Sequence, residues 1–209
     1  MQYCLWWGVT GKLSLLGFEL QSSTTMETLS AELVNSWRIE GIELNDAMVR
    51  SSLARKLGVE MAGLPEASHY IDGVVQVMLH ATIHADEPVT EQRLNAWHST
   101  LIPPASVHIY GITVGRWREG EAPMQVVSGA FGHEKVHYEA PPSSNVPDEM
   151  AKLLQWIEQK DNLDPILRAA IAHLWFVSIH PYDDGNGRIA RTLTELLLAR
   201  ADGMKQRFY

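Results

Sequence analysis

The sequence contains very little cysteine and has no excess of basic residues. Cys4 is the only cysteine among 209 residues, which excludes an internal disulfide and a zinc site built from cysteines, and suits a reducing cytoplasm. Lys and Arg number 17 against 25 Asp and Glu, so the formal net charge is −8. Because no basic run or basic–aromatic stripe is present, we do not expect a nucleic-acid backbone to be the main partner.

The chain also lacks a long uninterrupted apolar run. Residues 3–20 are apolar but are interrupted by glycines and charged residues. This stretch therefore predicts no membrane-spanning helix and, without a basic leader, no signal peptide. We expect a buried segment anchored by Trp6 and Trp7. Exposure of this pair would instead favour a contact between two copies, so a homodimer stays open.

The most informative stretch runs from His180 to Arg191 and has the sequence HPYDDGNGRIAR. Asp164-Pro165 predicts the start of a helix that ends near His180, because the residue before a proline is disfavoured in the α region. Helical spacing of mostly apolar residues supports that helix: Ile166, Ala169, Ala170, His173, Leu174 and Val177. A second helix is expected from about Arg188, so the pattern predicts a helix, a tight glycine-rich turn and a helix.

The turn combines the groups that a phosphate site needs. Gly185 and Gly187 allow backbone N–H groups to converge on an anion, and the start of the next helix adds a positive dipole end. Arg188 and Arg191 are three residues apart and would share a helix face from which both reach phosphate oxygens. Asp184 offers the kind of oxygen ligand that Mg²⁺ prefers.

His180 adds a side chain that can accept a proton near neutral pH. Each of these residues has a plainer explanation when taken alone. His180 would serve as a helix cap, the Asp184-Gly185 and Asn186-Gly187 pairs as ordinary turns, and the two arginines as a solvated face. Together, at this spacing, they favour phosphoryl or nucleotidyl transfer.

The stretch resembles the signature of the Fic (filamentation induced by cyclic AMP) family, in which His-Pro-Phe precedes an acidic residue, Gly-Asn-Gly-Arg and a second arginine. Tyr182 replaces the usual phenylalanine, and we expect the ring packing to survive. The resemblance extends from about Glu32 to Arg200. It implies an all-α Fic fold with a small β-hairpin flap. It also implies a protein adenylyltransferase that moves AMP from ATP to a hydroxyl side chain of a target protein and releases pyrophosphate.

The resemblance also implies roles for the residues of the motif. His180 would be the general base, and Asp184 would hold Mg²⁺, with Mn²⁺ as an alternative ion. The remaining motif residues would bind the nucleotide phosphates: Gly185, Asn186, Gly187, Arg188 and Arg191.

A shorter motif lies upstream. Thr24–Glu27 predicts a helix start, and Ser36 and Glu40 lie four residues apart on that helix. The segment resembles the inhibitory motif of Fic proteins, which implies that Glu40 pairs with Arg191 and keeps the γ-phosphate of ATP from its productive position. A serine and a glutamate at this spacing also occur on ordinary solvated helices.

Other elements complete the expected organisation. Helices are predicted over 45–57, with Gly58 as the residue after the helix end, over 74–84, after Thr90, and over 148–159. Strand character is clearest over 107–114 and 125–127, and a hairpin is expected over 115–129. The resemblance makes this hairpin the flap, in which Met124, Gln125, Val126 and Val127 would hold a target segment by strand addition. A purely structural hairpin is the alternative. We divide the chain into an N-terminal helical region, 1–60, and a Fic core, 61–209.

The sequence is also compatible with two alternative functions. One is the reverse enzyme, which removes AMP with Glu40 orienting a water molecule. The other is a non-catalytic regulator that binds nucleotide and partner. The AMP-removing enzyme would need Glu40 for activity, whereas Glu40 would suppress an AMP-transferring enzyme. An assay with labelled ATP distinguishes an AMP-transferring enzyme from a non-catalytic regulator. We expect ATP and a target protein as partners, and no membrane.

Overall fold

The computed structural model describes residues 18–59, 63–103, 111–128, 133 and 135–202. These residues form mostly helices with one small antiparallel sheet, which confirms the predicted fold class. Trp6, Trp7 and most of the strand expected over 107–114 lie outside the described residues; 111–114 contain no strand. The elements are α2 (Phe18–Ile39), α3 (Asp46–Leu57), α4 (His69–Ile83), α5 (Glu91–Leu101), β1 (Gln125–Ser128), β2 (Lys135–Glu139), α7 (Val146–Ile157), α8 (Pro165–Ile179) and α9 (Asn186–Asp202), with a 3₁₀ turn at Ser143–Asn145.

The chain divides into two compact units, residues 1–75 with 206–209, and residues 76–205. In the first unit α2 packs on α3, and the Ser30 hydroxyl of α2 donates to Asp46 of α3 at 2.8 Å. Trp37 is buried near the end of α2, where its indole N–H donates to the Tyr70 hydroxyl at 2.9 Å. Within the part of the chain that is described, no helix has both the length and the apolar content needed to cross a membrane.

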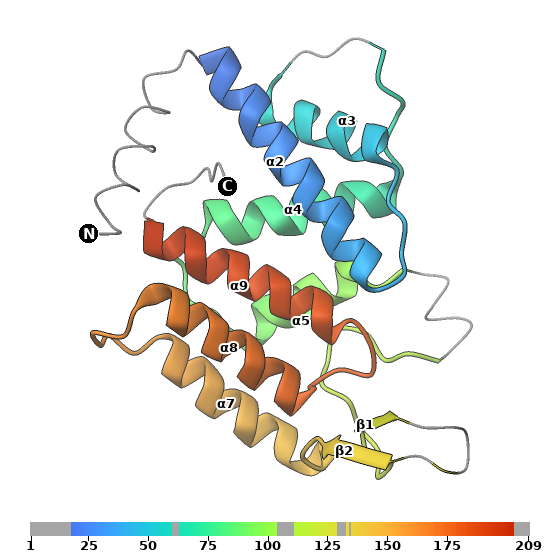
Figure 1. The fold of residues 1–209 in the computed structure, drawn as a ribbon, viewed down its shortest axis with the longest axis vertical. Helices are drawn as coiled ribbons and strands as arrows, with labels where there is room; N and C mark the ends of the chain where they lie inside the picture. The colour runs from blue at the N-terminus through green and yellow to red at the C-terminus, as the bar shows by residue number, and fades with distance from the viewer. Residues whose placement is uncertain (1–17, 60–62, 104–110, 129–132, 134, 203–209) are drawn as a thin grey trace. The chain divides into compact units, whose positions relative to one another are not determined.

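In the second unit α7, α8 and α9 lie side by side (Figure 1), and α5 packs against α9. Apolar side chains recur along the facing sides of these helices, as expected for helices that share one core. The buried apolar residues include Leu94, Trp97 and Leu101 of α5, Met150, Leu153 and Ile157 of α7, Ala169, Ala172, Phe176 and Ile179 of α8, and Ile189, Leu193, Leu196 and Leu197 of α9.

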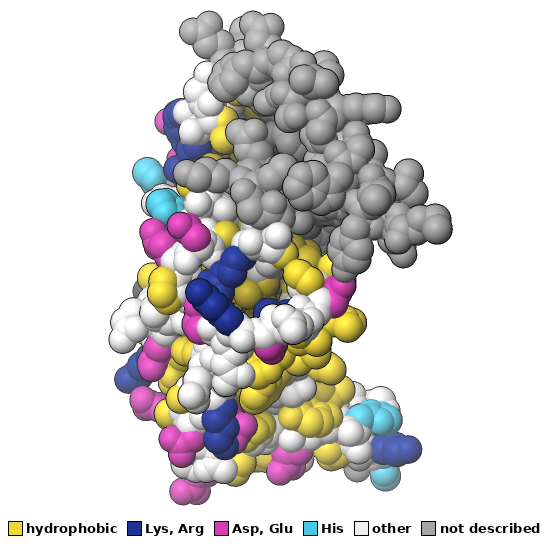
Figure 2. Space-filling view, turned by 90° about the vertical axis from the view of Figure 1, so that its left-hand side faces the viewer, with side chains coloured by type: hydrophobic (Ala, Val, Ile, Leu, Met, Phe, Trp, Pro, Cys, Tyr) yellow, Lys and Arg dark blue, Asp and Glu magenta, His cyan; other side chains and the backbone are white. Residues whose placement is uncertain are grey.

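The residues whose spacing predicted α8 are not all buried. Ile166 and Leu174 are 64% and 67% exposed, whereas Phe176 and Ile179 are buried. Helix α8 is apolar around much of its circumference, so spacing alone does not determine which side meets its neighbours. Figure 2 shows hydrophobic side chains gathered on the lower half of one face of the molecule.

The helix ends agree with the predicted capping residues in three helices. Asn45 and Thr90 accept hydrogen bonds from backbone N–H groups of the first turns of α3 and α5, and Gly58 ends α3 with φ +70°. Asp164 caps α8 in the same way through two N–H groups. The predicted start of α2 at Thr24 is wrong, because the helix begins at Phe18 and Thr24–Glu27 lies inside it.

The predicted hairpin boundaries are also wrong. The two strands pair Gln125–Ser128 with Lys135–Glu139, so the hairpin extends over 125–139 and only its first strand lies within the expected 115–129. The β-branched run at 126–127 pairs forward with Val136 and Tyr138. Residues 115–118 do not form a strand, because Trp117 and Arg118 are buried side chains of a loop that packs against the 180–182 segment.

Candidate active site

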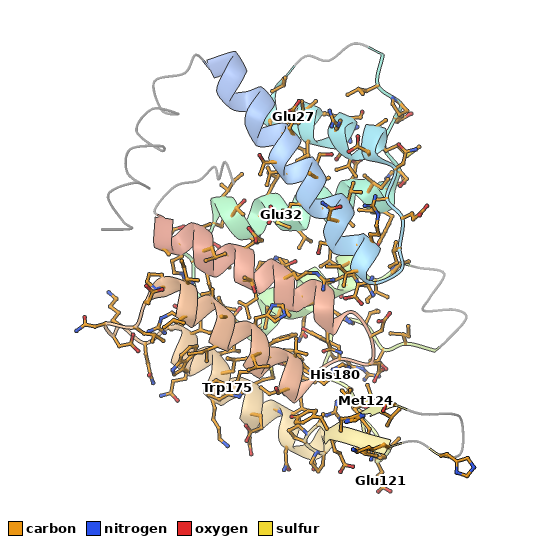
Figure 3. All side chains as sticks on the ribbon, in the orientation of Figure 1. Glu27, Glu32, Glu121, Met124, Trp175 and His180 are labelled. Carbon is orange, nitrogen blue, oxygen red and sulfur yellow. The ribbon has the colours of Figure 1, made fainter. Side chains whose placement is uncertain are left out.

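His180 occupies an unusual position at the end of α8, labelled in Figure 3. Its backbone N–H still bonds to the Phe176 carbonyl at 3.0 Å, but its φ and ψ angles of 52° and 60° are left-handed. It is the one non-glycine residue with positive φ in the described part of the chain. A left-handed conformation costs a residue with a Cβ about 1 kcal/mol. The conformation ends the helix abruptly and turns the chain towards Pro181.

The surroundings of His180 favour its neutral form. Burial lowers the pKa of the His180 imidazole below its ordinary value, and the positive charge of Arg118 lowers it further. A hydrogen bond with the backbone of Val177 and the negative charge of Asp184 act in the opposite direction and are outweighed. A neutral imidazole at neutral pH can take a proton, which is what the predicted general base requires.

Tyr182 is fully buried behind the turn. Its ring stacks on the His98 ring with centroids 3.9 Å apart and also contacts Trp117. Its hydroxyl donates to the Asn95 side-chain oxygen at 2.9 Å, and burial raises the pKa of this hydroxyl far above its ordinary value. The ring therefore packs as expected for the phenylalanine of the signature, and the added hydroxyl has an acceptor.

Replacing Tyr182 with phenylalanine is expected to have a small effect. The variant loses one hydrogen bond and leaves the Asn95 carboxamide, which is partly exposed, to bond with water. The expected loss in the free energy of unfolding is about 1 kcal/mol. Chemical denaturation measures it, with Asn95→Ala as the matched variant on the other side of the bond. A loss well above that of Asn95→Ala would mean that the hydroxyl does more than bond to Asn95.

The turn is closed by Asn186. Its side-chain oxygen accepts from the Tyr182 N–H at 3.0 Å, and its side-chain nitrogen donates to the Tyr182 carbonyl at 2.8 Å. Gly185 is left-handed at φ +77°, and a Cβ there would lie 2.7 Å from the Ile102 side chain. Asn186 uses its carboxamide inside the turn, so any phosphate contact from this residue would come from its backbone. Helix α9 begins here, and its first N–H groups have no acceptor within the helix.

Asp184 and Arg188 form an ion pair at the foot of the turn, with a distance of 3.1 Å between the closest nitrogen and oxygen. The Asp184 carboxylate also accepts from the Gly185 N–H at 2.6 Å, and its side chain remains 43% exposed. Arg188 is almost fully buried and donates to the Leu101 carbonyl at 2.7 Å. Its Nε is buried with no hydrogen-bond partner in the described residues. Arg188 therefore lies beneath the turn, not on an exposed face.

Arg191 follows one turn later on α9 and is partly exposed. Its positive charge acts on His173 of α8, whose pKa is lowered mainly by burial and then by this arginine. The His173 ring is held by the Thr194 hydroxyl at 3.0 Å. Of the two motif arginines, only Arg191 keeps an exposed portion from which it can reach a soluble ligand.

Asp184 fits the needs of a Mg²⁺ ion that arrives with a nucleotide. Mg²⁺ is commonly bound through one or two carboxylates together with substrate phosphates and water. The carboxylate is half-exposed and lies next to the N-terminus of α9, where phosphates are favoured. In the described ranges no group of three or more His, Cys, Asp and Glu side chains could hold a metal alone.

His98 is a site residue that the sequence did not indicate. It is fully buried on α5, accepts from the Gly115 N–H through Nδ1 at 3.0 Å, and lies 3.0 Å from the Asp184 carbonyl through Nε2. Because the Gly115 N–H already donates to Nδ1, the imidazole hydrogen must be on Nε2, which donates it to the Asp184 carbonyl. Burial lowers the pKa of His98, which agrees with this neutral form. No sequence pattern links α5 to a motif 86 residues later.

The hairpin is attached to the same helix end. The Tyr138 hydroxyl of β2 donates to the Ser178 carbonyl of α8 at 2.8 Å, two residues before His180. The Ala140 N–H donates to the Met124 carbonyl at 2.8 Å and closes the base of the hairpin. Every residue of both strands is exposed, including Val126 at 59% and Val127 at 47%.

The two predicted inhibitory residues lie in the first unit. Ser36 is buried in the last turn of α2, and Glu40 follows the helix in the turn that Gly41 completes with φ +72°. The Glu40 N–H donates to the Trp37 carbonyl at 3.0 Å. Glu40 is therefore presented at a helix end and is exposed.

Comparison with known proteins relates the chain to two families. A sequence model of the Fic/DOC family matches residues 88–198, slightly more than half of the 209 residues. A model described as a domain of unknown function (DUF4172) matches residues 7–59. The two matches share no residues.

Individual relatives agree with the first match. The chain is 27% identical to a protein adenylyltransferase Fic of Nematostella vectensis over 84% of this chain and 38% of the relative. It is 29% identical to one of Drosophila grimshawi, over 84% of this chain and 34% of the relative. The chain thus spans between a third and two fifths of the length of these relatives. A Fic domain containing signaling protein of Bacteroides thetaiotaomicron has a similar structure, with a TM-score of 0.65 and 25% identity over 91% of this chain and 69% of that one.

Proposed function

The chain belongs to the Fic/DOC family, and on that premise we propose that it transfers AMP from ATP to a hydroxyl side chain of a target protein. The observation that carries the proposal is the way the motif folds as one connected site. A histidine whose pKa is lowered by burial ends α8, a half-exposed carboxylate lies in the turn, and α9 begins directly after it. The names of the relatives support the same reaction class.

The reaction begins with proton removal by His180. The imidazole accepts the proton of the target hydroxyl, and the oxygen forms a bond to the α-phosphorus of ATP as the bond to pyrophosphate breaks. Asp184 would hold Mg²⁺, which supplies neutralisation of charge on the phosphates when bound. The N–H groups at the start of α9 and Arg191 would bind phosphate oxygens. Positioning and electrostatic stabilisation supply most of the rate gain in such chemistry.

The burial of Arg188 gives it a different task from Arg191. Its guanidinium holds the Asp184 side chain and the Leu101 carbonyl, so it fixes the carboxylate that would face the metal. Direct binding of the β- or γ-phosphate by Arg188 would require its unpartnered Nε to become accessible. We therefore assign the main phosphate contact to Arg191 and a supporting contact to Arg188.

Arg191→Ala is expected to weaken ATP binding and to remain weakly active when Glu40 is also replaced by glycine. An arginine that binds the γ-phosphate in the active state explains the loss of affinity, because charge-assisted hydrogen bonds to phosphate are among the stronger ones. Calorimetric titration with Mg-ATP measures the first effect and initial rates of AMP incorporation the second. A double variant as active as Glu40→Gly alone would remove Arg191 from the nucleotide site.

Inhibition is the second part of the proposal. Glu40 would pair with Arg191 in the resting enzyme, and Ser36 would support the helix end that carries Glu40. The proposal rests on the resemblance of Ser36–Gly41 to the inhibitory motif. In this scheme residues 1–60 form the region that carries the inhibitory helix and 61–209 the catalytic core; the separate family matches to 7–59 and 88–198 are in keeping with that division.

Target binding would use the exposed hairpin. Gln125, Val126 and Val127 belong to β1, which pairs with β2 along one edge, and Met124 directly precedes β1. An extended segment of the target would add to the free edge through main-chain hydrogen bonds, which leaves the choice of sequence loose. Tyr138 ties this hairpin to α8 near His180, so a bound segment would approach the base.

We also propose that the enzyme is cytoplasmic. The proposal makes no choice between a monomer and a homodimer.

The experiment that tests the function is mass spectrometry of purified Glu40→Gly protein after incubation with Mg-ATP. We expect self-modification by the mass of one AMP group, which establishes the donor and the reaction type together. The same protein with His180→Ala added is the matched control and should stay unmodified. Binding of Mg-ATP without any modification of this protein or of added lysate proteins would favour a non-catalytic regulator.

A further inference from the structure

Arg118 is a buried charged side chain that the reaction scheme above does not use. It lies in the loop before the hairpin and is 4% exposed. Its Nε donates to the His180 carbonyl at 2.7 Å, and its Nη2 donates to the Pro141 carbonyl at 2.5 Å and to the Ile179 carbonyl at 3.4 Å. Its backbone N–H donates to the Pro181 carbonyl at 2.8 Å.

These bonds gather on one short stretch of backbone. The carbonyls of Ile179 and His180 belong to the end of α8, where carbonyl groups lack partners within the helix. A cation at this end is also favoured by the helix dipole. The third acceptor, Pro141, lies directly after the base of the hairpin. One side chain therefore connects the end of α8 with the end of the hairpin.

The cost of burying Arg118 indicates that this arrangement is specific. A guanidinium keeps its charge in proteins, and burying it requires that its N–H groups find acceptors. Burial lowers the pKa of Arg118, and the negative charge of Asp183 is the nearby group that acts against this. Asp183 itself accepts from the Thr113 N–H at 3.1 Å. The carbonyls thus supply the hydrogen bonds, and Asp183 supplies the compensating charge.

We propose that Arg118 is a positioning residue, which fixes the left-handed backbone of His180 and sets the distance between this base and the hairpin that would carry the target hydroxyl. The inference rests on the proposed function for its consequence in catalysis. The structural part of the inference does not depend on the proposed function, because it rests on the bonds from Arg118 to the carbonyls of residues 179, 180 and 141.

The charge of Arg118 gives the inference a second, spectroscopic consequence. The groups that act on the His180 ring are burial and Arg118, which lower its pKa, and the Val177 backbone and Asp184, which raise it. Removal of the Arg118 charge leaves Asp184 as the charged neighbour. The pKa of His180 should then rise, and a larger fraction of the base should be protonated at neutral pH.

The chain offers a matched control two residues away. Arg116 lies in the same loop, and its side chain is 63% exposed. It pairs with the Glu119 carboxylate at 3.6 Å, and the Glu119 side chain is 72% exposed. Exposed pairs of this kind contribute little. Loss of the Arg116 charge should therefore leave both the backbone and the base unchanged.

The test compares Arg118→Gln, Arg118→Lys and Arg116→Gln, each in the Glu40→Gly background. Initial rates of AMP transfer give kcat and KM, and thermal unfolding checks the fold. NMR titration gives the pKa of His180, whose signal is assigned by comparison with His180→Ala.

For Arg118→Gln we expect a fall in kcat of roughly ten- to a hundredfold, an unchanged KM for ATP, and a raised His180 pKa. For Arg118→Lys we expect a retained His180 pKa with a lowered kcat, because one ammonium cannot hold the same three carbonyls. Arg116→Gln should match its parent.

The outcomes separate this inference from the proposed function. If Arg118→Gln is unfolded, Arg118→Lys decides: parental kcat in that variant overturns the positioning role. Parental kcat and His180 pKa in a folded Arg118→Gln overturn it as well. If the Glu40→Gly parent transfers no AMP, the proposed function fails, while the NMR titration still decides whether Arg118 controls His180.

Discussion

His180→Ala is expected to lower AMP transfer by on the order of a hundredfold or more while leaving ATP binding nearly unchanged. The imidazole belongs to the residue that ends α8, whereas the N–H groups that would bind phosphates belong to the start of α9. Its proposed task concerns the incoming hydroxyl and not the nucleotide. Initial rates in the Glu40→Gly background and calorimetric titration with Mg-ATP measure the two effects separately.

The pH dependence provides an independent check on His180. Because burial and Arg118 lower the pKa of its ring, the neutral form should persist to pH values below the ordinary histidine pKa of 6.5. Transfer should stay level down to that range and then fall as the ring takes up a proton. The fall should be absent from the residual activity of His180→Ala. Near-parental turnover in that variant would contradict the assignment of the base.

Glu40→Gly is expected to raise AMP transfer well above that of the unsubstituted protein. The carboxylate would compete with the γ-phosphate for Arg191 and repel the productive pose of ATP, so its removal frees the arginine for the nucleotide. Little change in the free energy of unfolding is expected, since Glu40 is exposed in the turn after α2 and exposed pairs contribute little. Initial rates of AMP incorporation at equal Mg-ATP, with melting temperatures alongside, measure both.

Two results would change the assignment of Glu40. Equal rates for Glu40→Gly and the unsubstituted protein would mean that Glu40 lies at a helix end without an inhibitory role. A lower rate, together with loss of AMP removal from a modified target, would favour the reverse enzyme in which Glu40 orients a water molecule. Glu43→Gly is a suitable control, because Glu43 is also an exposed carboxylate in the segment after α2.

The sequence indicated the helices on either side of the motif because the signals are local. Asp164-Pro165 begins α8, and the glycines allow the turn. The sequence did not indicate which polar side chains hold the turn and which are exposed. Arg188 and Arg191 are equivalent by spacing, yet packing against Leu101 buries only Arg188.

The remaining errors have a common physical cause. His98, Asn95 and Arg118 reach the motif from other elements, through contacts that no local period encodes. The hairpin was placed too early for a related reason, since strand pairing depends on which segments meet and not on β-branched composition alone. Helix α8 shows the same limit, because its apolar surface exceeds what its neighbours cover.

The bond between His98 and Asp184 also has a consequence for the order of folding. His98–Asp184, Asn95–Tyr182 and Leu101–Arg188 each join residues 86 or 87 positions apart, so all three require closure of nearly the same long loop. Helices α8 and α9 can form early from local contacts, but the turn between them acquires these partners only when α5 docks. A fragment containing only 164–202 should therefore be helical yet fail to hold the Tyr182–Asn186 turn. The site is then among the last parts of the second unit to become ordered.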